Sequence, residues 1–125
     1  MKDIQEEADV ELLIKTFYGR ALKDDLLAPH FEGVDFEHHL PRMYAFWNFI
    51  LLGKEGITGN VFHQHKSMNI GGEEFDTWVR IFGNTVDELF EGVIADKAKN
   101  QANLLGFTFN QKMKYMELGK YSVKE

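Results

Sequence analysis

Two histidines, His63 and His65, lie two residues apart in the stretch NVFHQHKSMN. Such a pair can ligate one metal ion when both imidazoles face the same side of the backbone, as they would in a strand. In a helix, residues two apart point about 200° away from each other. The glycine-rich GKEGITGN precedes the stretch and no β-branched run follows it, which favours a short helix over about 61–67. The two histidines are therefore expected to face different environments.

The residues one helical turn earlier distinguish these histidines. Val61 and Phe62 precede His65 by four and three residues, whereas an asparagine and a glycine hold these positions for His63. We therefore expect His65 on an apolar face and His63 in solvent. A neutral imidazole on an apolar wall is the ligand that a porphyrin iron requires. A single histidine is nevertheless more often a surface residue, or a core residue bonded to a backbone carbonyl.

The same phase argument separates His38 from His39. His39 shares a helical face with Met43 and Phe46, whereas His38 shares one with Arg42. His39 is therefore the candidate pocket residue of this pair.

Apolar residues recur at helical spacing through most of the chain, and strict alternation is scarce. Helices are expected over about 7–24, 36–52, 61–67, 73–91 and 94–118, with a short helical piece in DDLLAPHFEG. Pro41 is tolerated only in the first turn of its helix, which would put the true start of that helix near Glu37–Leu40. The pattern predicts an all-α domain.

Composition narrows the classes of function. The 125 residues fit one domain, and 44% of them are hydrophobic, enough for a sizeable core. The net charge of −6 and the lack of a basic stripe argue against nucleic-acid binding. The absence of cysteine excludes disulfides and thiolate-bound metals and fits a cytoplasmic location. The longest apolar run, YAFWNFILLG, is too short to cross a membrane.

Four segments, in this order and spacing, resemble the truncated haemoglobins, and are most similar to their third group: IKTFYGRALKDDLLAPHF, HHLPRMYAFWNFILLG, VFHQH and FDTWVRIF. The resemblance covers about residues 7–115. It implies an all-α, single-domain shortened globin fold, a 2-over-2 helical sandwich around haem b. The domain would span residues 1–125, with frayed ends at 1–6 and 119–125.

The resemblance also implies roles for individual residues. His65 would be the proximal iron ligand, and Arg42 would pair with a haem propionate. The distal, ligand-stabilising set would be Tyr18, His39 and Trp78. The residues expected to contact the cofactor are Phe31, Arg42, Met43, Phe46, Phe62, His65, Ile70, Phe75 and Ile81. Pro41 departs from the family pattern and leaves the orientation of His39 open, and His63 has no family role.

The implied function is binding of O2, CO or NO at a five-coordinate iron. Phenol and indole donors in a dry pocket would stabilise the partial charge of bound O2 and slow its release. NO dioxygenase-like or peroxidase-like activity on NO or peroxide, with an unidentified electron donor, stays open, and no catalytic residue is assigned. The alternative is a haem-free helical domain that binds a small apolar ligand or a protein partner.

Overall fold

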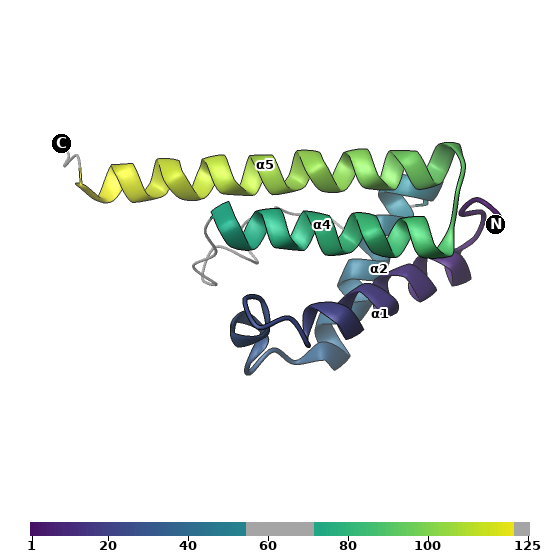
Figure 1. Cartoon of the computed structure of the whole chain (residues 1–125), viewed down its shortest axis with the longest axis horizontal. Helices are drawn as coiled ribbons and strands as arrows, with labels where there is room; N and C mark the ends of the chain where they lie inside the picture. The colour runs from purple at the N-terminus through teal and green to yellow at the C-terminus, as the bar shows by residue number, and fades with distance from the viewer. Residues whose placement is uncertain (55–71, 122–125) are drawn as a thin grey trace.

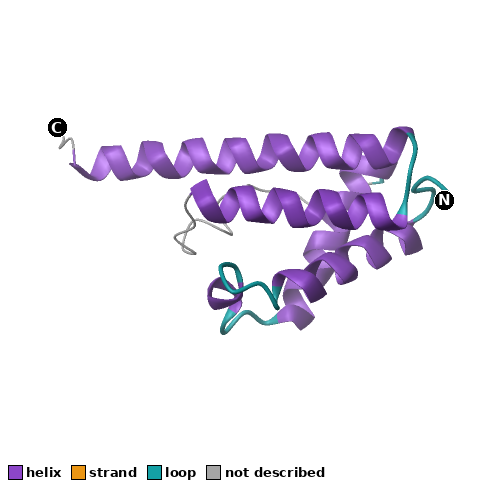
Figure 2. Ribbon diagram, in the orientation of Figure 1, coloured by secondary structure: helices purple, strands orange, loops and turns teal. Residues whose placement is uncertain are grey.

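The protein is all-helical in the residues that the computed structural model describes, which are 1–54 and 72–121, with side chains as far as residue 108. The elements are α1 (Glu7–Ala21), the short 3-10 helix η1 (Ala28–Phe31), α2 (Phe36–Leu52), α4 (Gly72–Leu89) and α5 (Val93–Tyr121). Figure 2 shows helices and connecting loops only in these ranges. The predicted all-α fold class is confirmed, while the helix predicted over 61–67 lies outside the described residues.

The four long helices pack as two pairs. α4 and α5 run antiparallel and side by side, joined by a short turn, and α1 packs against both α2 and α4 (Figure 1). α2 makes a smaller contact with α5. None of the helices in the described ranges is long and apolar enough to cross a membrane.

Small residues allow α5 to approach α4 closely. Ala95, Ala98, Ala102 and Gly106 recur every three or four residues along α5 and are all buried. A Cβ atom added to Gly106 would lie only 2.6 Å from Cγ2 of Val79 on α4. The crossing therefore depends on a glycine at this position.

The N-terminus of α5 is capped by a residue from the other end of the sequence. Gly92 precedes the helix at φ 138° and has no side chain with which to cap it. Instead, the Asp3 carboxylate accepts hydrogen bonds from the backbone N–H groups of Ile94, at 2.9 Å, and Ala95, at 2.8 Å. These are two of the amides that a local N-cap side chain would normally satisfy. A Cβ at Gly92 would lie 2.6 Å from Asp3 Cγ, so this cap requires glycine there.

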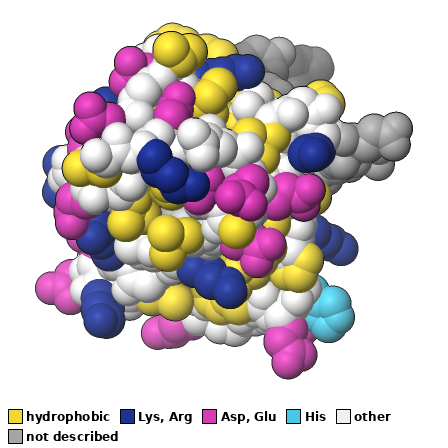
Figure 3. Space-filling view, turned by 90° about the vertical axis from the view of Figure 1, so that its right-hand side faces the viewer, with side chains coloured by type: hydrophobic (Ala, Val, Ile, Leu, Met, Phe, Trp, Pro, Cys, Tyr) yellow, Lys and Arg dark blue, Asp and Glu magenta, His cyan; other side chains and the backbone are white. Residues whose placement is uncertain are grey.

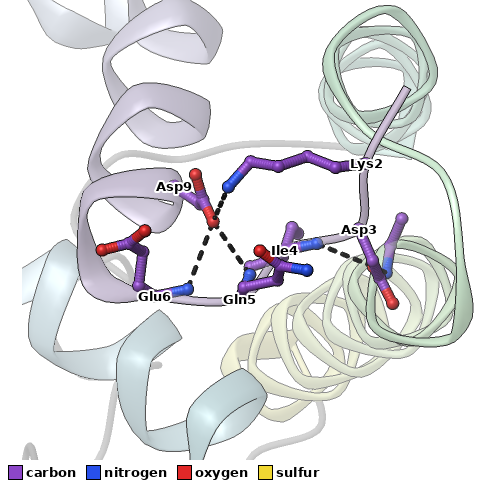
Figure 4. Close-up of polar contacts among 7 residues, drawn as sticks. Lys2, Asp3, Ile4, Gln5, Glu6 and Asp9 are labelled. Atoms are coloured by element: carbon purple, nitrogen blue, oxygen red, sulfur yellow. Dashed lines mark hydrogen bonds and ion pairs between the residues drawn. The ribbon is translucent and has the colours of Figure 1, made fainter.

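A second carboxylate, that of Asp9, holds the N-terminal segment to α1. It forms a 2.7 Å ion pair with Lys2 Nζ and accepts hydrogen bonds from the backbone N–H groups of Gln5 and Glu6 (Figure 4). Ile4 is only 2% exposed and belongs to the core. The N-terminal residues therefore contact two helices, through Asp9 on α1 and through the Asp3 cap of α5. An acidic N-terminal sequence does not reveal these contacts.

The face at this end of the molecule carries both signs of charge. Figure 3 shows acidic, basic and apolar side chains interspersed over it, without a broad area of one kind.

Pro41 lies further inside α2 than expected. The helix begins at Phe36, with Asp35 as its N-cap accepting a hydrogen bond from Glu37 N at 3.1 Å, so Pro41 is in the second turn. The expectation of a start near Glu37–Leu40 is wrong. We attribute the tolerance to the N-cap and to the buried face that follows the proline, since burial of several large side chains outweighs one lost backbone hydrogen bond.

Candidate functional site

Tyr18, in the last turn of α1, is enclosed by rings from three elements. Its side chain is 7% exposed. The Phe17 ring centroid lies 5.0 Å from that of Tyr18, and those of Phe31 and Phe36 each lie 5.7 Å away. All three contacts are edge-to-face, the arrangement that aromatic quadrupoles favour. The phenol therefore lies in a predominantly apolar environment.

The Tyr18 hydroxyl has one described polar partner, His39 on α2. Its Oη lies 2.9 Å from His39 Nε2, and the two ring centroids are 5.4 Å apart. Burial raises the pKa of Tyr18 above its usual range, so the hydroxyl keeps its proton at neutral pH. Which group donates depends on the histidine tautomer: Tyr18 donates to an unprotonated Nε2, whereas a protonated Nε2 donates to the phenol oxygen.

The neighbouring histidine points elsewhere. His38 is 81% exposed, and its Nδ1 lies 2.6 Å from Oδ2 of the N-cap residue Asp35. The predicted difference between the two histidines, one directed inward and one outward, therefore matches their positions in the structure.

Trp78 on α4 lies one ring away from this pair. It contacts Phe17 edge-to-face at 5.9 Å and stacks on Phe82 at 5.9 Å. The structure records no ring contact or hydrogen bond between Trp78 and either Tyr18 or His39. Of the three residues expected to form the distal set, two are in direct contact and the third is connected to them through Phe17.

The other expected cofactor contacts occupy varied environments. Met43 and Phe46 are buried in the core, Phe31 and Ile81 are partly buried against it, and Phe75 is buried on α4. Arg42 is exposed on α2, three residues after His39. The expected iron ligand and two further expected contacts, His65, Phe62 and Ile70, lie outside the described residues.

Sequence reasoning assigned no role to several residues that shape this site. Phe36 contacts the rings of Tyr18, Phe31 and His39. Its position three residues before His39 on the same helical face was a usable signal. A hydrogen-bonded pair between His30 on η1 and Glu74 on α4 had no such signal, because its partners are 44 residues apart.

Tyr18 and His39 are a pair of hydrogen-bonding groups beside several aromatic rings. A buried neutral phenol stabilises partial negative charge more strongly than a water-exposed group would. Within the described ranges, no group of three or more histidine, aspartate or glutamate residues could hold a metal ion by itself. The described residues therefore form a helical domain with a phenol–imidazole pair among aromatic rings.

Comparison with known proteins identifies the family. The family model described as bacterial-like globin matches residues 2–112, and the chain belongs to that family. A group 1 truncated haemoglobin from Tetrahymena thermophila is 27% identical over 96 residues, which cover 74% of this chain and 79% of the relative. The crystal structure of a group III truncated haemoglobin from Campylobacter jejuni has a TM-score of 0.80 and 21% identity, and covers 90% of this chain and 95% of that one.

These matches confirm the resemblance to the truncated haemoglobins and the shortened globin fold. The family implies that haem is the cofactor and that a small gaseous molecule is the ligand.

Proposed function

We propose that this protein binds haem b as one globin domain over residues 1–125 and takes up O2 at the iron, with Tyr18 and His39 on the distal side. The observation that carries the proposal is the 2.9 Å hydrogen bond between Tyr18 Oη and His39 Nε2 inside an aromatic enclosure, in a chain of a globin family. When bound, haem supplies an iron atom at which a diatomic ligand can be held.

The distal pair supplies hydrogen bonding in two ways. The pKa of Tyr18 is raised by burial, so its hydroxyl remains a donor over the physiological pH range. If His39 carries its proton on Nε2, it donates to the phenol oxygen and leaves the phenol proton for a ligand. If the proton is on Nδ1, Nε2 accepts the phenol proton and the ligand has to compete for it. The tautomer of His39 therefore governs how readily Tyr18 donates.

The remaining roles are those that the resemblance to the truncated haemoglobins implies. Trp78, which packs against Phe17, would add an indole donor on the same side. Arg42, which is exposed and three residues after His39, would pair with a haem propionate through its guanidinium. We propose His65 as the proximal ligand. The other apolar contacts of the cofactor in this proposal are Phe31, Met43, Phe46, Phe62, Ile70, Phe75 and Ile81.

The proposal extends to ligands and location. CO, NO and peroxide are small enough for the same site, and the same donors would polarise a bound peroxide. The chain without cysteine is expected in the cytoplasm. A haem-free domain that binds an apolar molecule or a partner protein is the alternative outcome.

One experiment tests the proposal. The purified chain is titrated with haem and its visible spectrum is recorded, with His65→Ala and the matched variant His63→Ala measured in parallel. We expect one haem per chain in the unmodified protein and in His63→Ala, and an altered Soret band and ligand spectrum in His65→Ala. An unchanged spectrum in His65→Ala would refute the assignment of the iron ligand, and no stoichiometric uptake by any variant would favour the haem-free alternative.

A further inference from the structure

A hydrogen-bonded histidine–glutamate pair connects η1 to α4 on the side of the molecule that carries Phe31. His30 Nε2 lies 3.2 Å from Glu74 Oε2, and each side chain is 20% exposed. The other histidine–carboxylate pair among the described residues, His38 with Asp35, is 81% and 62% exposed and lies within one helical turn. Of these two histidine–carboxylate pairs, that of His30 and Glu74 links separate elements in a partly shielded environment, where such contacts are screened less by solvent.

The segment that this pair holds is short, and besides this contact it packs on the core through the partly buried Phe31. η1 is four residues long, and none of its residues is buried. Its backbone is bonded locally, from His30 N to Leu27 O at 3.0 Å and from Val34 N to Phe31 O at 3.1 Å. Local bonds of this kind set the shape of a turn but do not fix it to the rest of the fold.

Both partners are next in sequence to a ring of the candidate site. His30 precedes Phe31, whose ring lies edge-to-face on Tyr18 at 5.7 Å. Glu74 precedes Phe75, which is buried on the first turns of α4. A tie between His30 and Glu74 therefore fixes the distance between two elements that carry aromatic residues of the site.

We propose that His30 and Glu74 are positioning residues, which hold η1 against α4 so that Phe31 stays packed on Tyr18, and which thereby limit how fast a small ligand reaches the distal pair. The second half rests on the proposed function. The contact does not require a charged imidazole, because a neutral ring with its proton on Nε2 also donates to the carboxylate.

Hydrogen exchange at single amides tests the positioning. The amides of His30 and Val34 report on η1, because His30 N bonds to Leu27 O just before the helix and Val34 N bonds to Phe31 O at its end. In the full chain as purified, Glu74→Ala and His30→Ala should each speed exchange at these amides by roughly three- to tenfold. The double variant should be little faster than either single one, since both remove the same contact. Exchange at amides inside α1, such as that of Tyr18, should not change.

A matched control is available in the same turn. Glu73 is exposed, so Glu73→Ala removes the same charge from α4 without removing the contact to His30. Glu74→Gln, which keeps an oxygen acceptor, should restore most of the protection at His30 and Val34. Exchange that is unchanged in Glu74→Ala, or equally fast in Glu73→Ala, would overturn the positioning role.

Ligand access is measured separately, in haem-loaded protein. After CO is removed by a light flash, we expect recombination from solvent to be several-fold faster in Glu74→Ala than in Glu73→Ala, with rescue in Glu74→Gln. Faster exchange at η1 with an unchanged CO rate would overturn the claim about access. Failure of every variant to bind haem would instead contradict the proposed function, and the exchange measurements would still decide the positioning.

Discussion

Replacement of Tyr18 by phenylalanine tests the distal pair most directly. The change removes one oxygen atom and leaves the ring, so the edge-to-face contacts with Phe17, Phe31 and Phe36 are kept. No cavity is created, and a change in ligand kinetics can be attributed to the lost hydroxyl rather than to repacking.

The size of the effect follows from the surroundings of that hydroxyl. A hydrogen bond to a partly charged acceptor contributes about 1–3 kcal/mol, and the 7% exposure of Tyr18 leaves little water to replace it. This range corresponds to an O2 dissociation rate that rises roughly 5- to 150-fold. His39 Nε2 loses its hydrogen bond to Tyr18 in the same variant. If His39 then donates to the ligand, the rise in the O2 dissociation rate should lie near the lower end of this roughly 5- to 150-fold range. The double variant Tyr18→Phe with His39→Leu should reach the upper end.

The assay is stopped-flow displacement of O2 from the reduced, haem-loaded protein. Tyr44→Phe is the matched control, because Tyr44 lies on α2 and makes no ring contact with Tyr18 or His39 in the structure. CO is the matched ligand, since it carries less charge and depends less on a donor. An O2 dissociation rate in Tyr18→Phe equal to that of Tyr44→Phe would refute the hydrogen-bonding role of Tyr18.

Three further predictions concern the scaffold. Gly106→Ala should lower the free energy of unfolding by about 1–3 kcal/mol in urea, because its Cβ would meet Val79 at 2.6 Å, and Val79→Ala should restore part of the loss; no rescue would contradict the packing argument. Asp3→Ala should lower the free energy of unfolding by about 1 kcal/mol in the same assay, because α5 loses its cap. The losses in Asp3→Ala and Gly92→Ala should not add fully in the double variant, and full additivity would show that the two changes act separately. Burial acts to raise the pKa of Asp3 and Asp9, but the backbone N–H donors of both, with Lys2 for Asp9, outweigh it and lower both values below the ordinary 3.8. The stabilisation that these two carboxylates give to the folded state is therefore complete above pH 3.8 and is lost as the pH falls through their lowered pKa values. In an acid titration followed by circular dichroism, the stability of Asp3→Asn should depend less on pH than that of the unmodified protein.

The bounds of the long helices were largely predictable, because one apolar face per helix repeats at a fixed period. The expected helix over 36–52 matches α2, and that over 73–91 differs from α4 by one residue at its start and two at its end. The first helix was expected to reach residue 24 but ends at Ala21, where the backbone N–H of Leu22 still bonds to Tyr18 O. The period of the apolar residues can continue past the end of a helix. It does not depend on the backbone hydrogen bonds that define that end.

The contacts that connect distant parts of the chain could not be predicted in the same way. Asp3 and Ile94 are 91 residues apart, and an aspartate in an acidic N-terminal stretch resembles an ordinary surface residue. The pair of His30 and Glu74 is equally invisible, since helical phase relates residues a few positions apart and not residues on different elements. The inward direction of Tyr18 and His39 did follow from phase, because each lies on an apolar stripe of its own helix.

From the sequence, Pro41 left the orientation of His39 open. The structure shows what holds the imidazole next to a helix turn that contains a proline. Pro41 has no N–H with which to bond the carbonyl four residues earlier, so the first turn of α2 is joined to the rest of the helix by fewer backbone bonds. That turn is fixed from its other side: the His39 amide bonds to Asp35 O at 2.9 Å, and the Asp35 carboxylate caps Glu37 N. The imidazole is then held by Tyr18 rather than by a continuous helix. The same hydrogen bond therefore orients both the phenol and the histidine, and the loss of either residue should remove one of the contacts that orient the other.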